Sequence, residues 1–233
     1  MAEMAPLGGA RLMILLASIA VGTMGCHVGA GEPPAPLAVD AGSATEGYPV
    51  GPYGIGRGSV ISNFEFTGYV DPSAGLGEAA RSTITLADFH NPTGEGTAPA
   101  GSPLGEGQPL PRALLINVSA VWCVACQREA SQVLPGEYAR FQPQGGELLL
   151  DLAESSALGQ VADFGDLDNW VTAYDVTYPA VVDPTYQLGA LFDSSAFPAN
   201  ILVDPRDMTI VELVSGVPQD GFWLALDELC AAP

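Results

Sequence analysis

The sequence predicts an α/β domain in which a central mixed sheet is flanked by helices. The first observation is the stretch 113–132, in which the apolar, β-branched run 114–118 is typical of a buried parallel strand and is followed by a helix-competent segment. The second is a pair of extended segments, 199–203 and 209–214, separated by the turn-forming residues 204–207. These segments predict an antiparallel hairpin in the same sheet.

Residues 1–25 are expected to be a signal peptide. The apolar run 12–22 follows Arg11 and is shorter than the ~20 residues that a membrane-spanning helix needs. Small residues lead to Cys26, the position at which bacterial lipoproteins are cleaved and acylated, although the preceding residues match the usual lipobox only at Gly25. We expect a lipid anchor on Cys26, with plain secretion or an uncleaved N-terminal anchor as alternatives.

Residues 26–47 are expected to form a flexible tether. They are rich in Gly, Ala and Pro and contain almost no large apolar side chain, so they cannot bury enough surface to offset the entropy of ordering. The folded domain should therefore occupy residues 48–233.

The N-terminal part of this domain predicts two short strands and a long loop. The alternating run 60–69 and the segment 82–89 read as strands. About twenty residues of Gly, Pro and small polar types follow, at about 91–111. Loops of this length are uncommon in compact domains, and we interpret this one as an exposed insertion, with a mobile flap near the active site as the alternative.

The two cysteines that follow the 114–118 strand are the main functional candidates. Cys123 would lie at a helix N-terminus, where unpaired N–H groups and the helix dipole favour the thiolate over the thiol. Cys126 lies one turn further on. It can close a ring with Cys123, either as a disulfide or by displacing a partner from a mixed disulfide.

Other uses of the cysteine pair fit less well. A structural zinc site needs two more ligands at matching spacing, and c-type haem attachment needs a His where the chain has Gln127. A purely structural disulfide would close a short loop and stabilise little. We therefore favour redox chemistry, with no metal and no cofactor.

These residues resemble the thioredoxin superfamily. A strand, then the run Trp122-Cys123-Val124-Ala125-Cys126, then a helix is similar to its active site, and Asn117 with Glu129 resembles the extracytoplasmic TlpA/ResA-like branch of these redoxin-like proteins. The resemblance covers roughly residues 60–233. It implies a thioredoxin-like fold with extra N-terminal strands, and the activity of a thiol-disulfide oxidoreductase.

The resemblance also implies roles for individual residues. Glu129 would relay a proton to or from the cysteines, the alternative being a solvated helix carboxylate. Pro198 would be a cis proline facing the cysteine pair, so that Trp122, Phe197 and Pro198 contact an extended substrate segment; the alternative is an ordinary turn proline.

The segments after the cysteines predict alternating helices and strands. A helix is expected from Cys123 to about Phe141, kinked at Pro135 because proline removes a backbone hydrogen bond. Gly145 and Gly146 should end this unit, and a second core strand is expected at 147–152.

A cluster of acidic residues precedes the next helix, which is expected at 167–174. Asp163, Asp166 and Asp168 could suggest calcium, but the segment lacks the Gly and the distal Glu of an EF-hand loop. We interpret these residues as helix-capping groups.

The last segment, 219–230, predicts an amphipathic helix with Phe222, Leu226 and Leu229 on one face. Cys230 falls near that face. A leftover thiol at this spacing is expected to be a small buried hydrophobe, with a third redox partner as the alternative.

Charge excludes one class of function. The 233 residues include 27 acidic side chains against seven Arg and no Lys, for a net charge of −20, which makes binding to a phosphate backbone improbable. The expected partners are disulfide-containing proteins, a thiol electron donor and a membrane reached through the lipid anchor, with no nucleic acid. We expect the protein to lie on the periplasmic face of a bacterial membrane or to be secreted. The outer membrane is slightly preferred, because His27 is not the Asp that favours retention in the inner membrane.

Two functions compete with the oxidoreductase. A peroxiredoxin-like peroxidase would share the fold, but it needs Thr where the chain has Ala120. A non-catalytic surface lipoprotein would keep the fold as a binding module. Between the cysteines, Val124 and Ala125 supply no positive charge to stabilise a thiolate, so a mild reductant is expected rather than a strong oxidant.

Overall fold

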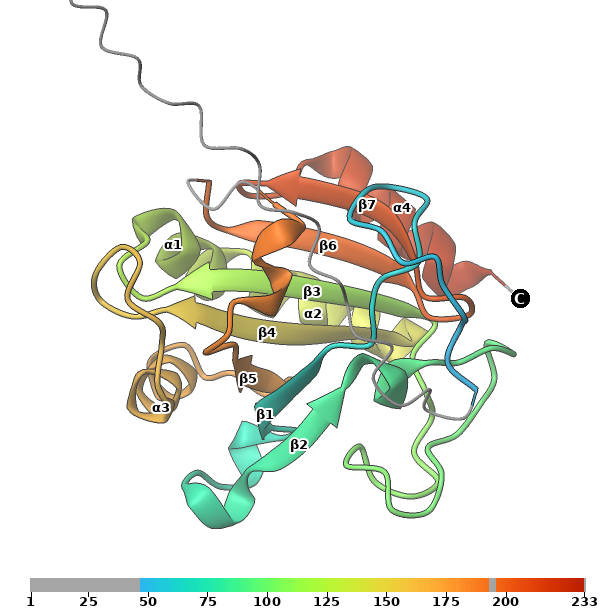
Figure 1. Cartoon of the computed structure of the whole chain (residues 1–233), viewed down its shortest axis with the longest axis horizontal. Helices are drawn as coiled ribbons and strands as arrows, with labels where there is room; N and C mark the ends of the chain where they lie inside the picture. The colour runs from blue at the N-terminus through green and yellow to red at the C-terminus, as the bar shows by residue number, and fades with distance from the viewer. Residues whose placement is uncertain (1–46, 193–195, 233) are drawn as a thin grey trace, which may run out of the picture. The chain divides into compact units, whose positions relative to one another are not determined.

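The computed structural model describes residues 47–192 and 196–232. The predicted signal peptide, Cys26 and all but the last residue of the predicted tether lie outside these residues. The strands are β1 Glu65–Tyr69, β2 Ser82–Thr85, β3 Ala113–Ala120, β4 Gly146–Glu154, β5 Ala180–Val182, β6 Ala199–Asp204 and β7 Thr209–Ser215. They form one seven-stranded sheet in the order β2-β1-β5-β4-β3-β6-β7 (Figure 1).

The sheet is mixed, as predicted, and β3 is one of its inner strands, between β4 and β6. All eight residues of β3 are buried, and the strand is parallel to β4 and antiparallel to β6. β4 is parallel to β5, and β1 is antiparallel to β5. The two edge strands, β2 and β7, are antiparallel to β1 and β6. The sequence reading missed β5, because three residues between Pro179 and Asp183 are too few to show a period.

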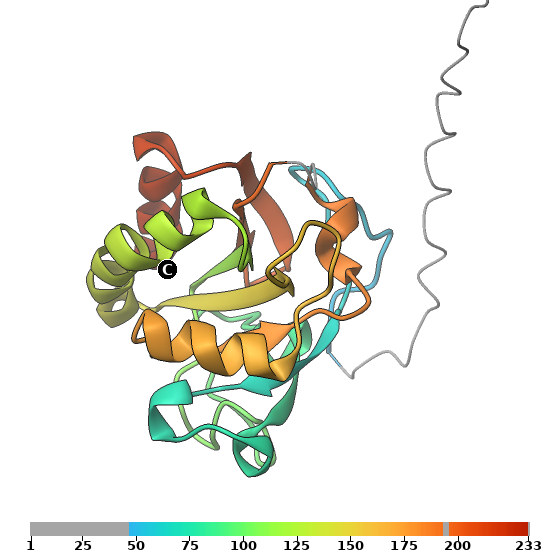
Figure 2. The ribbon, with the colours of Figure 1, turned by 90° about the vertical axis from the view of Figure 1, so that its left-hand side faces the viewer.

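Four α-helices flank the sheet. They are α1 Val124–Gln132, α2 Leu134–Phe141, α3 Phe164–Ala173 and α4 Asp220–Ala231. Figure 2 shows α1, α2 and α4 gathered on one side of the sheet, and α3 packs against β5.

The single kinked helix expected at 123–141 is instead two helices. The break falls at Val133, whose N–H donates to the Glu129 carbonyl at 3.0 Å as α1 ends. Pro135 lies in the first turn of α2, where its missing N–H leaves no bond unmade. In one continuous helix its ring would have met the carbonyl of Ser131, which explains why the chain starts a new helix.

The N-terminal strands are shorter than expected. Residues 60–64 are not part of β1, and Val60 forms an isolated bridge with Thr209 at the start of β7. β2 ends at Thr85, and a 3₁₀ turn follows, Leu86–Phe89, closed by a capping box between Thr85 and Asp88.

The long loop at 91–111 lies at the start of β3, at the end of the strand opposite to α1 (Figure 1). The side chain of Asn91 connects the two ends of this loop by hydrogen bonds. Its Nδ2 donates to the carbonyls of Leu110 and Pro111, and its Oδ1 accepts from the Gly96 N–H. These bonds satisfy backbone groups that a loop on the surface would otherwise leave to water.

The acidic cluster before α3 contributes two of its three members to a helix cap. Asp163 and Asp166 form a reciprocal capping box, and the helix begins at Phe164, three residues earlier than expected. Asp168 does not cap; it accepts from the Tyr69 hydroxyl and pairs with Arg81 at 3.6 Å.

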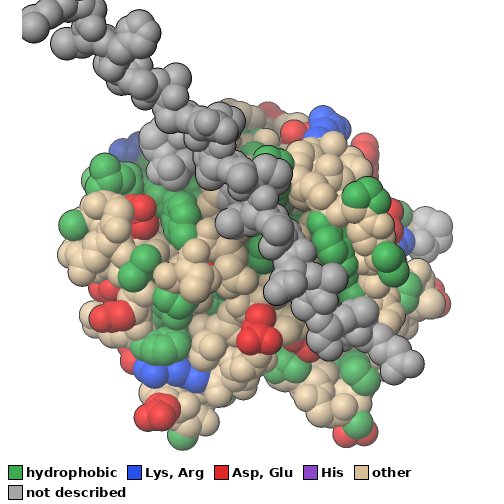
Figure 3. Space-filling model, in the orientation of Figure 1, with side chains coloured by type: hydrophobic (Ala, Val, Ile, Leu, Met, Phe, Trp, Pro, Cys, Tyr) green, Lys and Arg blue, Asp and Glu red, His purple; other side chains and the backbone are tan. Residues whose placement is uncertain are grey.

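The surface carries the acidic excess. Figure 3 shows Asp and Glu side chains spread over the visible face of the molecule. Within the described residues, no helix combines the length and apolarity needed to cross a membrane.

Candidate active site

The cysteine pair lies where β3 passes into α1. Cys123 is the N-cap of α1, and its sulfur accepts from the Cys126 N–H at 3.0 Å. The two residues are joined by a disulfide, with Cα atoms 5.2 Å apart. Cys123 keeps 3% of its surface exposed and Cys126 none. Of the two sulfurs, Cys123 is therefore the one that a partner can reach first.

Aromatic side chains form a wall beside the disulfide. The Trp122 indole N–H donates to Glu154 Oε2 at 2.6 Å, which fixes the ring against the end of β4. Phe197 meets this ring edge-on at 5.8 Å between centroids, and Phe192 meets Phe197 at 5.4 Å. The wall joins Trp122, which directly precedes Cys123, to the segment that leads into β6.

The Phe197–Pro198 peptide bond is cis. The next residue, Ala199, pairs with Val118 across the β3–β6 ladder, so Pro198 lies near the end of β3 from which the cysteine segment continues. The backbone N–H and C=O of Phe197 make no hydrogen bond within the described part of the chain. They can therefore pair with an extended segment of another protein.

Glu129 lies buried on the same face of α1 as Cys126, one turn away, with no exposed surface. Two amides hold its carboxyl group. Asn117 Nδ2 donates to Oε2 at 2.8 Å, and Asn200 Nδ2 donates to Oε1 at 3.0 Å. Asn117 Nδ2 also reaches Asn200 Oδ1 at 2.9 Å, so the three side chains form a closed network. The alternative of a solvated helix carboxylate is wrong for this residue.

The surroundings of Glu129 shift the pKa of its carboxyl group toward neutral pH. Burial raises the pKa of Glu129 to about 7, because a charged carboxylate loses its hydration there, while the hydrogen bonds from Asn117 and Asn200 oppose that rise. A carboxyl group with this pKa can both accept and release a proton near pH 7.

Comparisons with known proteins agree with this geometry. No family model matches the chain. Over 106 residues it is 26% identical to Thiol-disulfide oxidoreductase ResA of Bacillus subtilis strain 168, a match that covers 45% of this chain and 54% of that protein. The chain thus spans about half the length of this curated relative.

Solved structures share the fold. A secreted thiol-disulfide isomerase from Corynebacterium glutamicum superposes with a TM-score of 0.51 at 17% identity, covering 76% of this chain and 87% of that one. A hypothetical protein of Sinorhizobium meliloti 1021 gives a TM-score of 0.51 at 16% identity, covering 76% and 85%. The chain therefore has a thioredoxin-like fold, and part of it is similar in sequence to the thiol-disulfide oxidoreductase ResA.

Sequence reasoning missed one residue of this site. Asn200 stands directly opposite Asn117 in the β3–β6 register, and both are fully buried. Its signal in the sequence is a lone Asn in the otherwise apolar strand that follows Pro198, since Asn is depleted in strands. Its role became visible only once the register was known.

Cys230 lies far from the redox pair. Its sulfur packs at Gly146, at the start of β4, whereas Cys123 follows the far end of β3, which is about 23 Å long at 3.3 Å per residue. The residue is 3% exposed, and burial raises the pKa of its thiol to about 11. In this thioredoxin-fold domain Cys230 packs as a small apolar side chain, whereas Leu229 is only half-buried.

Proposed function

We propose that the protein is a thiol-disulfide oxidoreductase that acts on protein disulfides outside the cytoplasm. The observation that carries this proposal is a set of three features: a disulfide at a helix N-terminus, a cis proline where β6 begins next to the end of β3, and a buried carboxyl group one turn from Cys126 on α1. The name of the relative ResA, thiol-disulfide oxidoreductase, supports the same chemistry.

In the reducing direction, two exchange steps complete the reaction. The Cys123 thiolate attacks one sulfur of a substrate disulfide, forms a mixed disulfide with it, and releases the other substrate sulfur as a thiolate. Cys126 then attacks the Cys123 sulfur, which forms the Cys123–Cys126 disulfide and releases the second substrate thiolate. Two electrons pass to the substrate, and a separate thiol donor must return two electrons to the pair.

Glu129 has a proton role in the second step. Cys126 is a weak nucleophile until it loses its proton, and the ionised Glu129 carboxylate, one turn away on α1, accepts that proton. Asn117 and Asn200 act as positioning residues, because each holds one carboxylate oxygen.

The substrate segment lies along the aromatic wall. The backbone of Phe197, which has no hydrogen-bond partner among the described residues, offers one donor and one acceptor near the cysteine segment, while Trp122 and Pro198 supply apolar contact. Val124 and Ala125 are exposed and uncharged, so they add no electrostatic stabilisation to a thiolate. A mild reductant follows from this environment rather than a strong oxidant.

The proposed location is extracytoplasmic. Residues 1–25 would be removed as a signal peptide, Cys26 would carry the lipid, and residues 26–47 would tether the domain to the membrane, with the outer membrane slightly preferred. Fatty-acid labelling of the wild-type chain in a bacterial host should be lost in Cys26→Ala. A label that persists in the variant would contradict acylation at this residue.

The test of the activity is reduction of insulin disulfides with dithiothreitol as electron donor. Cys123→Ser should reduce the rate to the uncatalysed background, because the first nucleophile is gone. Cys230→Ala is the matched control: it removes a cysteine at the opposite end of the domain and should keep the wild-type rate. Equal rates for wild type and Cys123→Ser would instead identify a non-catalytic binding module.

A further inference from the structure

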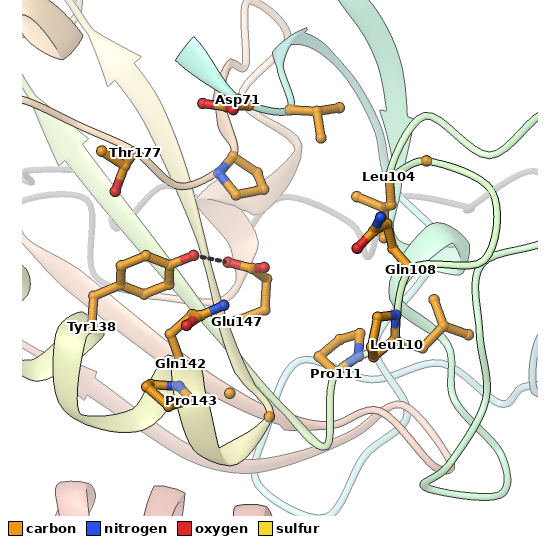
Figure 4. A pocket seen from close by; sticks show the side chains of 16 residues that line it. Asp71, Leu104, Gln108, Leu110, Pro111, Tyr138, Gln142, Pro143, Glu147 and Thr177 are labelled. Atoms are coloured by element: carbon orange, nitrogen blue, oxygen red, sulfur yellow. Dashed lines mark hydrogen bonds between the residues drawn. The ribbon is translucent and has the colours of Figure 1, made fainter. Parts of the chain in front are cut away.

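A pocket of about 640 Å³ lies at the end of the sheet opposite to the disulfide. We call it the β4-start pocket. Its walls come from α2 with Tyr138, from the 3₁₀ turn after α2 with Gln142, from the start of β4 with Glu147, and from the long loop before β3 with Gln108 and Leu110 (Figure 4). Its volume lies within the roughly 300–1,000 Å³ that is typical of small-molecule sites.

Glu147 gives this pocket a specific polar group. Oε1 accepts two hydrogen bonds, from the Tyr138 hydroxyl at 3.1 Å and from the Leu148 N–H at 2.8 Å. Oε2 accepts none from residues 47–192 or 196–232. Figure 4 shows the carboxyl group beside Tyr138, on the cavity side of β4. One oxygen is therefore available to a ligand.

The charged side chains that line the pocket are all acidic. Two carboxyl side chains, Glu147 and Asp71, belong to its lining, and no lining residue is Arg, Lys or His. Burial raises the pKa of Glu147 to about 7, since the group loses hydration with no cation to compensate. A ligand with a positive charge would supply the missing counter-charge.

Part of the remaining lining is apolar. Pro111, Pro143 and Leu104 line the same space, and the Tyr138 ring stands next to Glu147 (Figure 4). Such walls suit the hydrocarbon part of a ligand, and an aromatic face attracts a cation held close to it. The pocket thus places apolar side chains near one accepting carboxylate, alongside the polar lining residues Gln108, Gln142 and Thr177.

We propose that the β4-start pocket binds a small organic cation, an amine with an apolar body, whose ammonium group donates to Glu147 Oε2. The apolar body lies against the prolines and Leu104. This activity is separate from the proposed disulfide exchange, because the pocket and Cys123 lie at opposite ends of β3.

The test uses three compounds of the same shape and different charge: benzylamine, benzyl alcohol and benzoate. Each compound is titrated into the whole chain in an isothermal titration calorimeter. Benzylamine should bind at least about tenfold more tightly than benzyl alcohol, as expected of a charge-assisted hydrogen bond. Benzoate should bind least, because it meets two carboxyl groups.

Variants assign the effect to Glu147. Glu147→Gln keeps an acceptor for the Tyr138 hydroxyl and should remove the preference for benzylamine, whereas Glu228→Gln, an exposed charge on α4, should leave it intact. Thr177→Trp, at an exposed lining position, should fill the cavity and abolish binding without touching Glu147. Circular dichroism would establish that each variant is folded.

Some outcomes would overturn the proposal. Equal binding of the three compounds, no binding at millimolar concentration, or a benzylamine preference that survives Glu147→Gln would each do so. Binding by Cys123→Ser at the wild-type affinity is also expected, so failure of the redox proposal would not affect this result.

Discussion

Glu129 and Asp151 are two buried carboxyl groups on opposite faces of the central strands. Asn117 pairs with Leu150, so the neighbouring Asp151 points away from the face on which Asn117 meets Glu129. Each oxygen of Glu129 accepts an amide hydrogen bond, whereas neither oxygen of Asp151 has a partner among the described residues. Burial raises the pKa of both groups, and Asp183 raises that of Asp151 further.

The contrast shows what marks a functional carboxyl group in this domain. A raised pKa alone does not, because both groups have one. Glu129 differs in its two amide partners and in its place one turn from Cys126 on α1. Burial of the Asp151 carboxyl group costs free energy that no hydrogen bond from the described residues offsets. We therefore expect Asp151 to affect the stability of the fold rather than the reaction.

The largest expected effect comes from removing the Glu129 charge. Glu129→Gln keeps an oxygen for one Asn but cannot accept the Cys126 proton, so the rate of insulin reduction at pH 8 should fall about 10²-fold, the scale of general-base catalysis. In the wild type the rate should rise as pH increases through about 7, where Glu129 ionises, and this inflection should vanish in the variant.

Asp151→Asn is the matched control for that experiment. It removes a buried carboxyl group of the same kind from the other face of the sheet, and it should keep both the rate and the pH inflection. Loss of the inflection in Asp151→Asn would remove the distinction between the two groups.

Asn200→Leu should have the next largest effect. It removes the amide from Glu129 Oε1, and since that hydrogen bond lowers the pKa of Glu129, the pKa should rise. For a rise of about one pKa unit the rate at pH 7 should fall about fivefold, because the ionised fraction of Glu129 drops from about one half to about one tenth, and it should recover toward the wild-type rate at pH 9. A purely structural role would instead lower the rate equally at both pH values.

Asp151→Asn should change stability in a pH-dependent way. The folded-state pKa of Asp151 is raised, so the neutral form stabilises the wild type below about pH 4, and that contribution is lost as pH rises through the raised value. The Asn variant has no such loss and should be more stable at pH 8, by about 1–3 kcal/mol. Urea unfolding at pH 4 and pH 8 measures the difference, and an advantage that does not grow with pH would contradict the account.

Ser119→Ala should have the smallest effect. The Ser119 hydroxyl donates to Asn117 Oδ1 at 2.8 Å, so the variant leaves that oxygen unpaired at a cost of about 1 kcal/mol in the free energy of unfolding. It does not touch Glu129, and the pH inflection of activity should stay near 7. A shift of this pH inflection in Ser119→Ala would show that the hydrogen bond from Ser119 to Asn117 also affects the pKa of Glu129, which Ser119 does not contact.

The sequence revealed those parts of the site that are set by spacing along one helix. The positions of Cys123 and Cys126 follow from a strand followed by a helix, whereas Glu129 was singled out by the resemblance to TlpA/ResA-like proteins. The structure places all three at the start of α1 or on it. The hairpin of β6 and β7 was also predictable, because a turn-forming cluster separates two apolar runs.

Features that depend on strand register could not be predicted in this way. The two hydrogen bonds to the Glu129 carboxylate require Asn117 and Asn200 to lie opposite each other across β3 and β6. No local sequence pattern encodes this strand register. Asp151 lies within an apolar run that reads as a uniformly buried strand. The β4-start pocket could not be predicted either, because one of its walls is a Gly- and Pro-rich loop whose path depends on hydrogen bonds from the side chain of Asn91.

The most direct test of the exchange mechanism is to trap its mixed disulfide. Cys126→Ser removes the resolving thiol, so incubation of the reduced variant with oxidised insulin should leave an insulin chain attached through Cys123, which mass spectrometry of the digested adduct would locate. Cys123→Ser should form no such adduct. An adduct on Cys230, or none in a folded Cys126→Ser protein, would contradict the account.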